Sequence, residues 1–214
     1  MTLWVRLNSV SIKPGNLMNK PFAESCAQNQ QVILDVLKTL LTDTGTVLEI
    51  GSGTGQHAVF FTESMPHLYW QPSDLIEQHV GMQMWLDEVE HNRIKPPLEI
   101  DVDVGPWPVK NIDYVYTANT THIISSSQAE NMLKHIGSSL KPGGLFVQYG
   151  PFNYNGQYTS ESNACFDVWL KQRDPDSCIK HFETLEKQAN ENGMVIFKDI
   201  EMPANNRILV WRKA

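Results

Sequence analysis

The sequence of 214 residues lacks long apolar runs, and its first 20 residues lack the apolar core of a secretion signal. Because roughly 20 consecutive apolar residues are needed to span a bilayer, we expect no membrane segment. Residues 1–20 are predicted to form a loose extension. These absences predict a soluble, cytoplasmic protein, and the length fits one large domain over residues 21–214.

Basic residues and cysteines are also scarce. The chain has 17 Lys and Arg against 24 Asp and Glu, which gives a net charge of -7. Since surfaces that bind a phosphate backbone are basic, we expect no nucleic-acid partner. Cys26, Cys165 and Cys178 show no CxxC or histidine spacing for zinc. We therefore predict no metal site and expect these thiols to be free in a reducing compartment.

Two common nucleotide-binding motifs are missing. A dinucleotide-binding turn follows G-x-G-x-x-G, but counting from Gly51 places Gln56 where the third glycine should be. A P-loop requires Gly-Lys-Ser/Thr, which the chain lacks. An NAD-dependent oxidoreductase is therefore disfavoured.

The chain instead carries an apolar run, residues 47–50, followed by the alternating glycines Gly51, Gly53 and Gly55. This pattern predicts a strand, a tight turn and the start of a helix. Glycine permits positive φ and lets a ligand lie against the main chain, and the helix start offers free N–H groups. The alternative is a glycine-rich turn that binds nothing, but such a turn rarely needs three alternating glycines.

Strand and helix patterns alternate along the rest of the chain, which predicts an α/β protein with a parallel centre to its sheet. Helices are predicted at residues 22–41, 56–64, 75–91, 126–139, 162–174 and 179–192. Strands are predicted at residues 47–50, 67–71, 98–102, 111–117, 145–149, 194–201 and 208–212.

The run from Glu49 to Gly55 resembles motif I of the class I S-adenosylmethionine (SAM) methyltransferases, and Leu-Lys-Pro-Gly-Gly at residues 140–144 is similar to their sequence before the fifth strand. The resemblance implies a Rossmann-like fold: a mostly parallel seven-stranded sheet with an antiparallel final strand and helices on both faces. It also implies SAM as cofactor and S-adenosylhomocysteine as product, with Glu49 facing the amino-acid end of SAM. The residues expected at the cofactor are Asn29, Glu49, Gly51, Ser52, Gly53, Gly55, Gln56, Asp74, Asp101 and Asn119.

Two acidic residues follow predicted strands. Asp74 lies close to the ~20-residue distance from the glycines at which an acid binds ribose hydroxyls. A carboxylate can accept two hydrogen bonds from a cis-diol, although Asp is also favoured as a helix N-cap. The resemblance implies a further acid near the adenine after the third strand, and Asp101 is preferred over Asp103 for this role.

The loop after the fourth strand, residues 118–125, should face the reacting groups, because ligands bind at the carboxyl ends of such strands. His122 is the candidate general base, since its reference pKa is about 6.5. A histidine that only hydrogen-bonds a loop carbonyl is an equal alternative. The Asn/Asp-Pro-Pro-aromatic and Pro-Cys motifs of DNA methyltransferases are absent from this loop.

Residues 150–178 are predicted to form a lid over the site, with a polar aromatic loop followed by a helix. Arg173 in this helix would suit an anionic substrate, although a surface salt bridge is an equal alternative. The residues expected to orient the substrate are Tyr149, Asn153, Tyr154, Asn163, Asp167, Arg173, Asn205 and Asn206.

Several short blocks taken together narrow the resemblance to the methyltransferase-like 26 family, small proteins assigned as SAM methyltransferases without a characterised substrate. The match covers residues 21–214. It departs at Ile50-Gly51, where members have Ala or Val-Ala, and after Pro175, where they have Trp-Gly. The blocks are residues 52–58, 70–74, 98–102, 149–152, 162–167, 173–175 and 202–206, with Asn29, Asn119 and His122.

The resemblance implies a SAM-dependent methyltransferase that acts on a small molecule. Alignment of the two reactants could contribute about 7–11 kcal/mol, and a base would add roughly 10²–10⁴-fold for an alcohol, phenol or amine. The alternative is a SAM-binding protein with a regulatory or scaffold role and no turnover. The sequence indicates neither the acceptor nor the oligomeric state.

Overall fold

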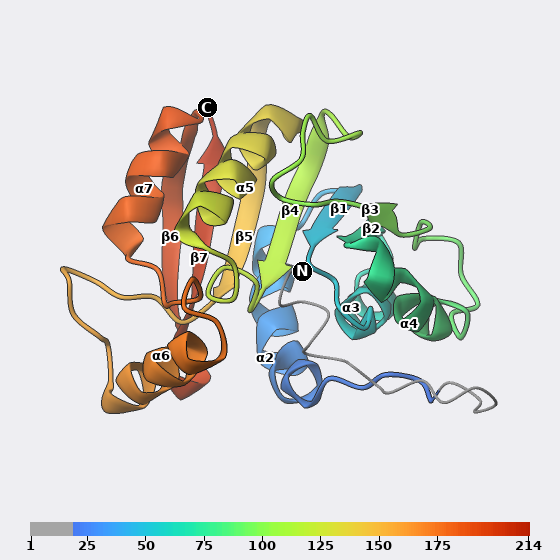
Figure 1. The fold of residues 1–214 in the computed structure, drawn as a ribbon. Helices are drawn as coiled ribbons and strands as arrows, with labels where there is room; N and C mark the ends of the chain where they lie inside the picture. The colour runs from blue at the N-terminus through green and yellow to red at the C-terminus, as the bar shows by residue number, and fades with distance from the viewer. Residues whose placement is uncertain (1–18) are drawn as a thin grey trace.

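The computed structural model describes residues 19–214, so the predicted extension lies almost entirely outside the described residues. Strands and helices alternate along the chain (Figure 1). The helices are α2 (Glu24–Leu40), α3 (Gln56–Ser64), α4 (Ile76–Leu86), α5 (Ser126–Ser139), α6 (Glu161–Arg173), α7 (Phe182–Glu191) and the 3-10 turn η1 (Pro203–Asn205). The strands are β1 (Gly45–Ile50), β2 (Leu68–Asp74), β3 (Leu98–Glu99), β4 (Ile112–Ala118), β5 (Leu140–Gly150), β6 (Met194–Met202) and β7 (Asn206–Lys213).

The strands form one seven-stranded sheet in the order β3-β2-β1-β4-β5-β7-β6. Strands β1 to β5 pair in parallel, and β7 runs antiparallel to both of its neighbours. The predicted fold class is confirmed. The chain winds outward from β1 in one direction and from β4 in the other, so their junction is the point at which such sheets bind ligands.

Two hydrophobic cores cover the two faces of the sheet. One packs α2 and α3 against residues such as Val47 and Tyr116, and the other packs α5 and α7 against residues such as Leu48 and Val115. The alternation along β1 and β4 sends neighbouring side chains to opposite faces. Helix α6 lies apart from both layers, beyond the carboxyl end of β5 (Figure 1).

The structure differs from the predicted elements at several boundaries, among them three of the largest. Strand β5 begins at Leu140, because Leu140 already pairs with Ile112 of β4 before an irregularity and the next pairing, Tyr114 with Leu145. The proline and glycines there were expected to delay the strand. Helix α4 ends at Leu86, earlier than residue 91, and β3 contains only Leu98 and Glu99.

Helix α5 begins where local chemistry favours it. The hydroxyl of Ser125 accepts a hydrogen bond from the backbone N–H of Gln128, and the Gln128 side chain accepts one from the N–H of Ser125. This capping box fixes the end of the loop after β4.

Among the helices of residues 19–214, none has the length and hydropathy needed to cross a membrane.

Aromatic packing between α3 and the sheet generates a first prediction. Phe61 is fully buried, and its ring centroid lies 5.5 Å from that of Trp70 and 5.6 Å from that of Tyr116. We expect Phe61→Ala to lower the free energy of unfolding by about 3–5 kcal/mol, because it removes buried area and leaves a cavity. Urea unfolding followed by circular dichroism measures this loss.

The matched control is Val80→Ala on α4, where the side chain is 60% exposed. That change should stay within about 0.5 kcal/mol. A similar loss in both variants would mean that the aromatic cluster does not stabilise the fold as described.

Candidate functional site

The glycine turn after β1 is fixed by hydrogen bonds to the end of β2. The backbone N–H groups of Gly51 and Ser52 both donate to the Ser73 carbonyl at 3.0 Å. Gly51 has φ 71°, and a Cβ there would lie 2.6 Å from Thr120 Oγ1, so the position excludes a side chain. Gly53 has φ 54°, and a Cβ added there would have no neighbouring atom within 4 Å. A ligand can therefore approach the main chain at Gly53.

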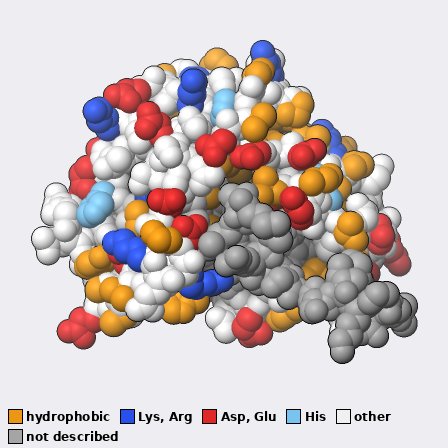
Figure 2. Space-filling model, viewed as in Figure 1, with side chains coloured by type: hydrophobic (Ala, Val, Ile, Leu, Met, Phe, Trp, Pro, Cys, Tyr) orange, Lys and Arg blue, Asp and Glu red, His pale blue; other side chains and the backbone are white. Residues whose placement is uncertain are grey.

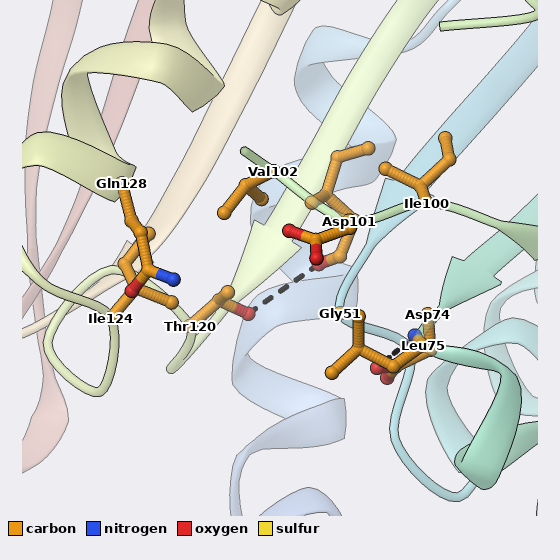
Figure 3. Close-up of a pocket in the computed structure, with 10 residues that line it drawn as sticks. Gly51, Asp74, Leu75, Ile100, Asp101, Val102, Thr120, Ile124 and Gln128 are labelled. Carbon is orange, nitrogen blue, oxygen red and sulfur yellow. Dashed lines mark hydrogen bonds between the residues drawn. The ribbon is translucent and has the colours of Figure 1, made fainter. Parts of the chain in front are cut away.

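A pocket lies beside this turn, at the junction of β1 and β4. It contains about 410 Å³ of empty space, part of which is open to solvent. Figure 3 shows Thr120 and Gln128 on one side and Asp74 and Leu75 on the other, with Asp101 between them. The lining residues are Ile50, Gly51, Asp74, Leu75, Ile100, Asp101, Val102, Thr120, Ile124 and Gln128.

Asp74 lies on the pocket wall, although it is only 3% exposed. Its Oδ2 accepts a hydrogen bond from Gly53 N–H at 2.7 Å and its Oδ1 accepts one from Leu75 N–H at 2.8 Å. Burial raises the pKa of Asp74 to about 6, against these two hydrogen bonds. Each oxygen keeps a lone pair for a ligand. The N-cap of α4 is Leu75, so Asp74 does not hold that position.

The two acids after β3 face different surroundings. Asp101 lines the pocket. Asp103 instead accepts hydrogen bonds from Gln128 at 2.9 Å and Asn131 at 3.0 Å, against α5. The structure therefore brings Asp101, and not Asp103, together with Asp74.

Glu49 is buried behind the glycine turn and is not part of the pocket lining. Its Oε2 accepts a hydrogen bond from Trp70 Nε1 at 2.8 Å, and its Oε1 lies 3.9 Å from His57 Nδ1. Burial raises the pKa of Glu49 to about 7, which leaves its carboxyl group partly protonated near neutral pH. The side chain faces the interior between β1 and β2.

Two more residues predicted at the cofactor belong to the same buried layer. The imidazole of His57 bonds through Nε2 to Asn29 Oδ1 at 2.8 Å, which joins α3 to α2. Burial lowers the pKa of His57 to about 4, so it is neutral and donates this bond. Gln56 Oε1 accepts from Ala23 N–H at 2.6 Å and from the Thr54 hydroxyl at 2.9 Å. Asn29 and Gln56 thus support the turn from behind and do not line the pocket.

The loop after β4 carries Asn119 and His122. Asn119 has φ 58° and donates its N–H to the Tyr149 carbonyl at 2.9 Å. A Cβ at Gly150 would lie 3.7 Å from His122 Nδ1 and 3.9 Å from Asn119 Oδ1. The absence of a side chain at Gly150 therefore leaves room for a methyl-sized group beside these two residues, at the carboxyl ends of β4 and β5.

His122 is buried against the lid, with its ring centroid 5.2 Å from that of Phe166 on α6. Within residues 19–214 no hydrogen bond to its imidazole is found, so the alternative of a bond to a loop carbonyl is not seen. Burial, together with the positive charge of Lys180, lowers the pKa of His122 to about 3. The ring is therefore neutral at physiological pH and only weakly basic.

Three of the residues predicted to orient the substrate, Asp167, Asn163 and Asn205, instead make contacts that hold α6 and the segment predicted to form a lid. Asp167 accepts hydrogen bonds from the Tyr158 hydroxyl at 2.7 Å, the Lys171 ammonium at 2.6 Å and Ile179 N–H at 2.6 Å. Burial opposes the ionised form of Asp167, but these three donors hold its pKa below the usual range. Asn163 donates to the Asn205 carbonyl at 3.0 Å, which ties α6 to η1.

Other members of that set point away from the pocket. The Tyr154 hydroxyl donates to Asp199 on β6 at 2.8 Å. The Arg173 guanidinium lies 4.3 Å from the ring centroid of Trp169 on the surface of α6, and Asn206 donates to the Pro203 carbonyl at 3.3 Å. Tyr149 is buried in the core that packs against α2.

Asn153 is the exception in this set. It is buried at the base of the lid, where its backbone N–H donates to the Lys180 carbonyl at 3.0 Å. Its side-chain Oδ1 has no hydrogen-bond partner among the described residues. A buried acceptor without a donor is costly, so Asn153 retains capacity to bind a ligand.

Residues 20–213 match a family described as a protein of unknown function (DUF938). The chain belongs to this family. The match leaves the activity open, because the family description assigns none.

Solved structures show the same fold. An O-methyltransferase family protein from Burkholderia thailandensis has 14% identity and a TM-score of 0.77, with 89% of this chain and 58% of that chain covered. Human N-acetylserotonin methyltransferase in complex with SAM has 16% identity and a TM-score of 0.74, covering 89% and 53%. An O-methyltransferase family 2 protein from Planctomyces limnophilus DSM 3776, in complex with apigenin, has 16% identity and a TM-score of 0.75, covering 89% and 60%.

This chain therefore spans little more than half the length of these methyltransferases. At such low identity the likeness shows the fold, a Rossmann-like methyltransferase fold, and not the activity.

Part of the pocket was missed by sequence reasoning. Thr120 and Gln128 line it from the loop after β4 and from α5, and only the folded chain brings them to Asp74. Ile100 and Val102 flank Asp101 in the sequence and also line the pocket, but their apolar character suggested only core packing. The remaining missed residues are Ile50, Leu75 and Ile124.

The burial of His122 generates a second prediction. Its pKa is held near 3, so the imidazole should stay neutral from pH 8 down to pH 5. Nitrogen chemical shifts of the His122 ring, assigned by comparison with His122→Gln, measure this by nuclear magnetic resonance. A midpoint between pH 6 and 7 would contradict the burial described here, because exposed imidazole titrates at about 6.5.

Proposed function

We propose that this protein of the DUF938 family is a SAM-dependent methyltransferase that acts on a small molecule. One observation carries the proposal: the pocket at the junction of β1 and β4 is lined both by Gly51 of the glycine turn and by Asp74, whose carboxylate accepts a hydrogen bond from Gly53 N–H of the same turn. In open α/β sheets, a glycine turn together with an acid at the end of the next strand is the arrangement that binds a nucleoside with a free diol.

The lining of the pocket fits the parts of SAM. Asp74 would hold the ribose hydroxyls, and Asp101 would accept from the adenine amine. Leu75, Ile100 and Val102 supply apolar walls for the base.

The charge of the site also suits a cationic cofactor. Figure 2 shows acidic side chains gathered around the apolar hollow at the centre of the face in view. Glu77 and Glu99 line a groove that adjoins the pocket and shares Asp101 with it. Complementary charge favours the approach and retention of a positively charged ligand.

SAM, when bound, supplies a methyl group already activated by the positive sulfonium. The chain would then have to align an acceptor and exclude water, which can contribute about 7–11 kcal/mol. The space beside Gly150, between Asn119 and His122, is where the acceptor would lie. The lid, residues 150–178, would cover it, within a single domain of residues 21–214.

Several independent features support this assignment. One of the similar structures is a complex with SAM and another is a complex with apigenin, a small molecule. The blocks that resemble the methyltransferase-like 26 family support the narrower assignment to that family. The net charge of -7 disfavours a nucleic-acid substrate, and three free cysteines support a cytoplasmic location.

The role of Asp74 gives a third prediction. Asp74→Ala should weaken binding of S-adenosylhomocysteine by about 10- to 150-fold, the equivalent of the 1.5–3 kcal/mol of hydrogen bonds to a charged group. In the wild type, affinity should fall as the pH drops below about 6, because protonation removes the better acceptor. Isothermal titration calorimetry between pH 5 and 8 measures both effects.

Asp35→Ala is the matched control, since Asp35 is an exposed carboxylate on α2 that accepts a hydrogen bond from Gln31 and is not part of the pocket lining. Its affinity for S-adenosylhomocysteine should equal that of the wild type. Equal loss in both variants, or a thermal shift with NADH and none with SAM, would refute the proposal. Binding of SAM without transfer of a labelled methyl group to any metabolite would favour the regulatory alternative.

A further inference from the structure

The turn after β4 is held by two side chains from a segment far along the chain. Ser177 and Lys180 lie between α6 and α7, and they are 2% and 6% exposed. The Ser177 hydroxyl donates to the Ile123 carbonyl at 2.8 Å, and the Lys180 ammonium donates to the Ile124 carbonyl at 2.7 Å. The partners are 54 and 56 residues apart in sequence, so both bonds are tertiary contacts and not part of the turn itself.

The same turn forms part of the pocket wall. Thr120 and Ile124 both line the pocket, on the side opposite Asp74 (Figure 3). The Thr120 carbonyl accepts hydrogen bonds from the N–H groups of Ile123 at 3.0 Å and Ile124 at 3.3 Å. The carbonyl of Ile123 and the N–H of Ile124 belong to one rigid, planar peptide unit. A shift of the carbonyl that Ser177 holds is therefore felt at Thr120.

The two carbonyls depend on these side chains because of where the next helix begins. Ser125 is the N-cap of α5, so the carbonyls of Ile123 and Ile124 precede the hydrogen bonds of the helix. A buried carbonyl that loses its donor is destabilised, and the chain around it tends to rearrange until the carbonyl finds another. Ser177 and Lys180 thus favour one arrangement of the turn over others.

The segment that carries these donors is itself tied to α6. Between them, the Ile179 N–H donates to Asp167 Oδ1 at 2.6 Å. A continuous series of hydrogen bonds therefore runs from α6, through Ser177 and Lys180, to the wall of the pocket.

We propose that Ser177 and Lys180 are positioning residues for the cofactor pocket, which hold Thr120 and Ile124 where the nucleoside binds. The inference rests on the proposed function, in which this pocket binds SAM. Neither donor is part of the pocket lining, so both act through the turn. Because coupling between sites is reciprocal, a bound cofactor should in return stabilise the segment from Ser177 to Lys180.

The first experiment needs no ligand. Ser177→Ala and Lys180→Met each remove one donor with little change in side-chain volume. In the full-length protein, both changes should shift or broaden the methyl resonances of Thr120 and Ile124 in nuclear magnetic resonance spectra, assigned with Thr120→Ser and Ile124→Val. The methyl resonances of Ile33, which is buried in the core beside α2, should keep their wild-type positions.

The second experiment measures binding of S-adenosylhomocysteine by calorimetry. Ser177→Ala and Lys180→Met should each weaken it by about three- to tenfold, the equivalent of the net contribution of one hydrogen bond. Lys180→Arg keeps N–H donors and should restore affinity to within about twofold of the wild type. In the wild type, S-adenosylhomocysteine should slow hydrogen exchange of the Ile179 amide by about five- to tenfold.

The matched controls are Ser138→Ala and Lys213→Met, which break the same kinds of bond away from the pocket lining. The Ser138 hydroxyl donates to the Lys134 carbonyl on α5 at 3.1 Å, and the Lys213 ammonium donates to the Asn192 carbonyl at 2.8 Å. Both variants should have the methyl spectrum and the affinity of the wild type.

Wild-type methyl positions and affinity in Ser177→Ala and Lys180→Met, with only a lower free energy of unfolding, would overturn the inference and make both residues structural. Equal losses of affinity in the two controls would overturn it too. If Lys180→Met does not fold, Ser177→Ala and Lys180→Arg decide the question. Failure of the proposed function has a different signature: the wild type does not bind S-adenosylhomocysteine, while the methyl resonances of Thr120 and Ile124 still shift in the variants.

Discussion

The hydrogen bond from Gly53 N–H to the Asp74 carboxylate, at 2.7 Å, joins the glycine turn to the wall of the proposed cofactor pocket. It connects the turn after β1 to the end of β2, and the Ser73 carbonyl adds two more bonds to the same turn. Backbone groups thus fix the position of a buried carboxylate. Burial raises the pKa of Asp74 to about 6, and the hydrogen bonds from Gly53 and Leu75 oppose that rise, so the carboxylate is mostly ionised at neutral pH.

Behind this contact lies a polar layer that never reaches the pocket. Glu49, His57 and Asn29 occupy it, with Trp70 closing one side through its indole N–H. Such a layer is costly unless its members are paired, and here the amide and imidazole are. Its effect is to fix α2 and α3 against β1, so the glycine turn rests on a rigid support.

Much of the fold could be predicted from sequence, because it depends on local patterns, and of the residues predicted at the cofactor Gly51, Asp74 and Asp101 line the pocket. Alternating apolar runs marked the strands, and the distance from the glycines marked Asp74. Which face a polar residue occupies is a different matter. Glu49 and Gln56 lie within the right motif but turn inward, and periodicity over so short a run does not decide between pocket and interior.

Residues that would bind the acceptor were harder to predict, because the polar residues of the segment predicted as a lid form hydrogen bonds with one another. Asp167 and Asn163 have the chemistry of substrate ligands, yet both are used to hold α6 in place. Lys180 lies in a segment without a recognised motif, and its burial beside Ile124 arises only when distant parts of the chain meet. Long-range contacts of this kind leave no periodic signal.

The anchoring of the lid has a consequence for how the protein could diversify. Asp167 bonds to both ends of the segment from Tyr158 to Ile179, so most of its fastening is internal. The segment touches the rest of the molecule by a few ties, among them Asn163 to Asn205 and Ser177 to the Ile123 carbonyl. Because few ties cross from this segment to the sheet, substitutions inside it would leave the hydrogen bonds between the glycine turn and β2 unchanged.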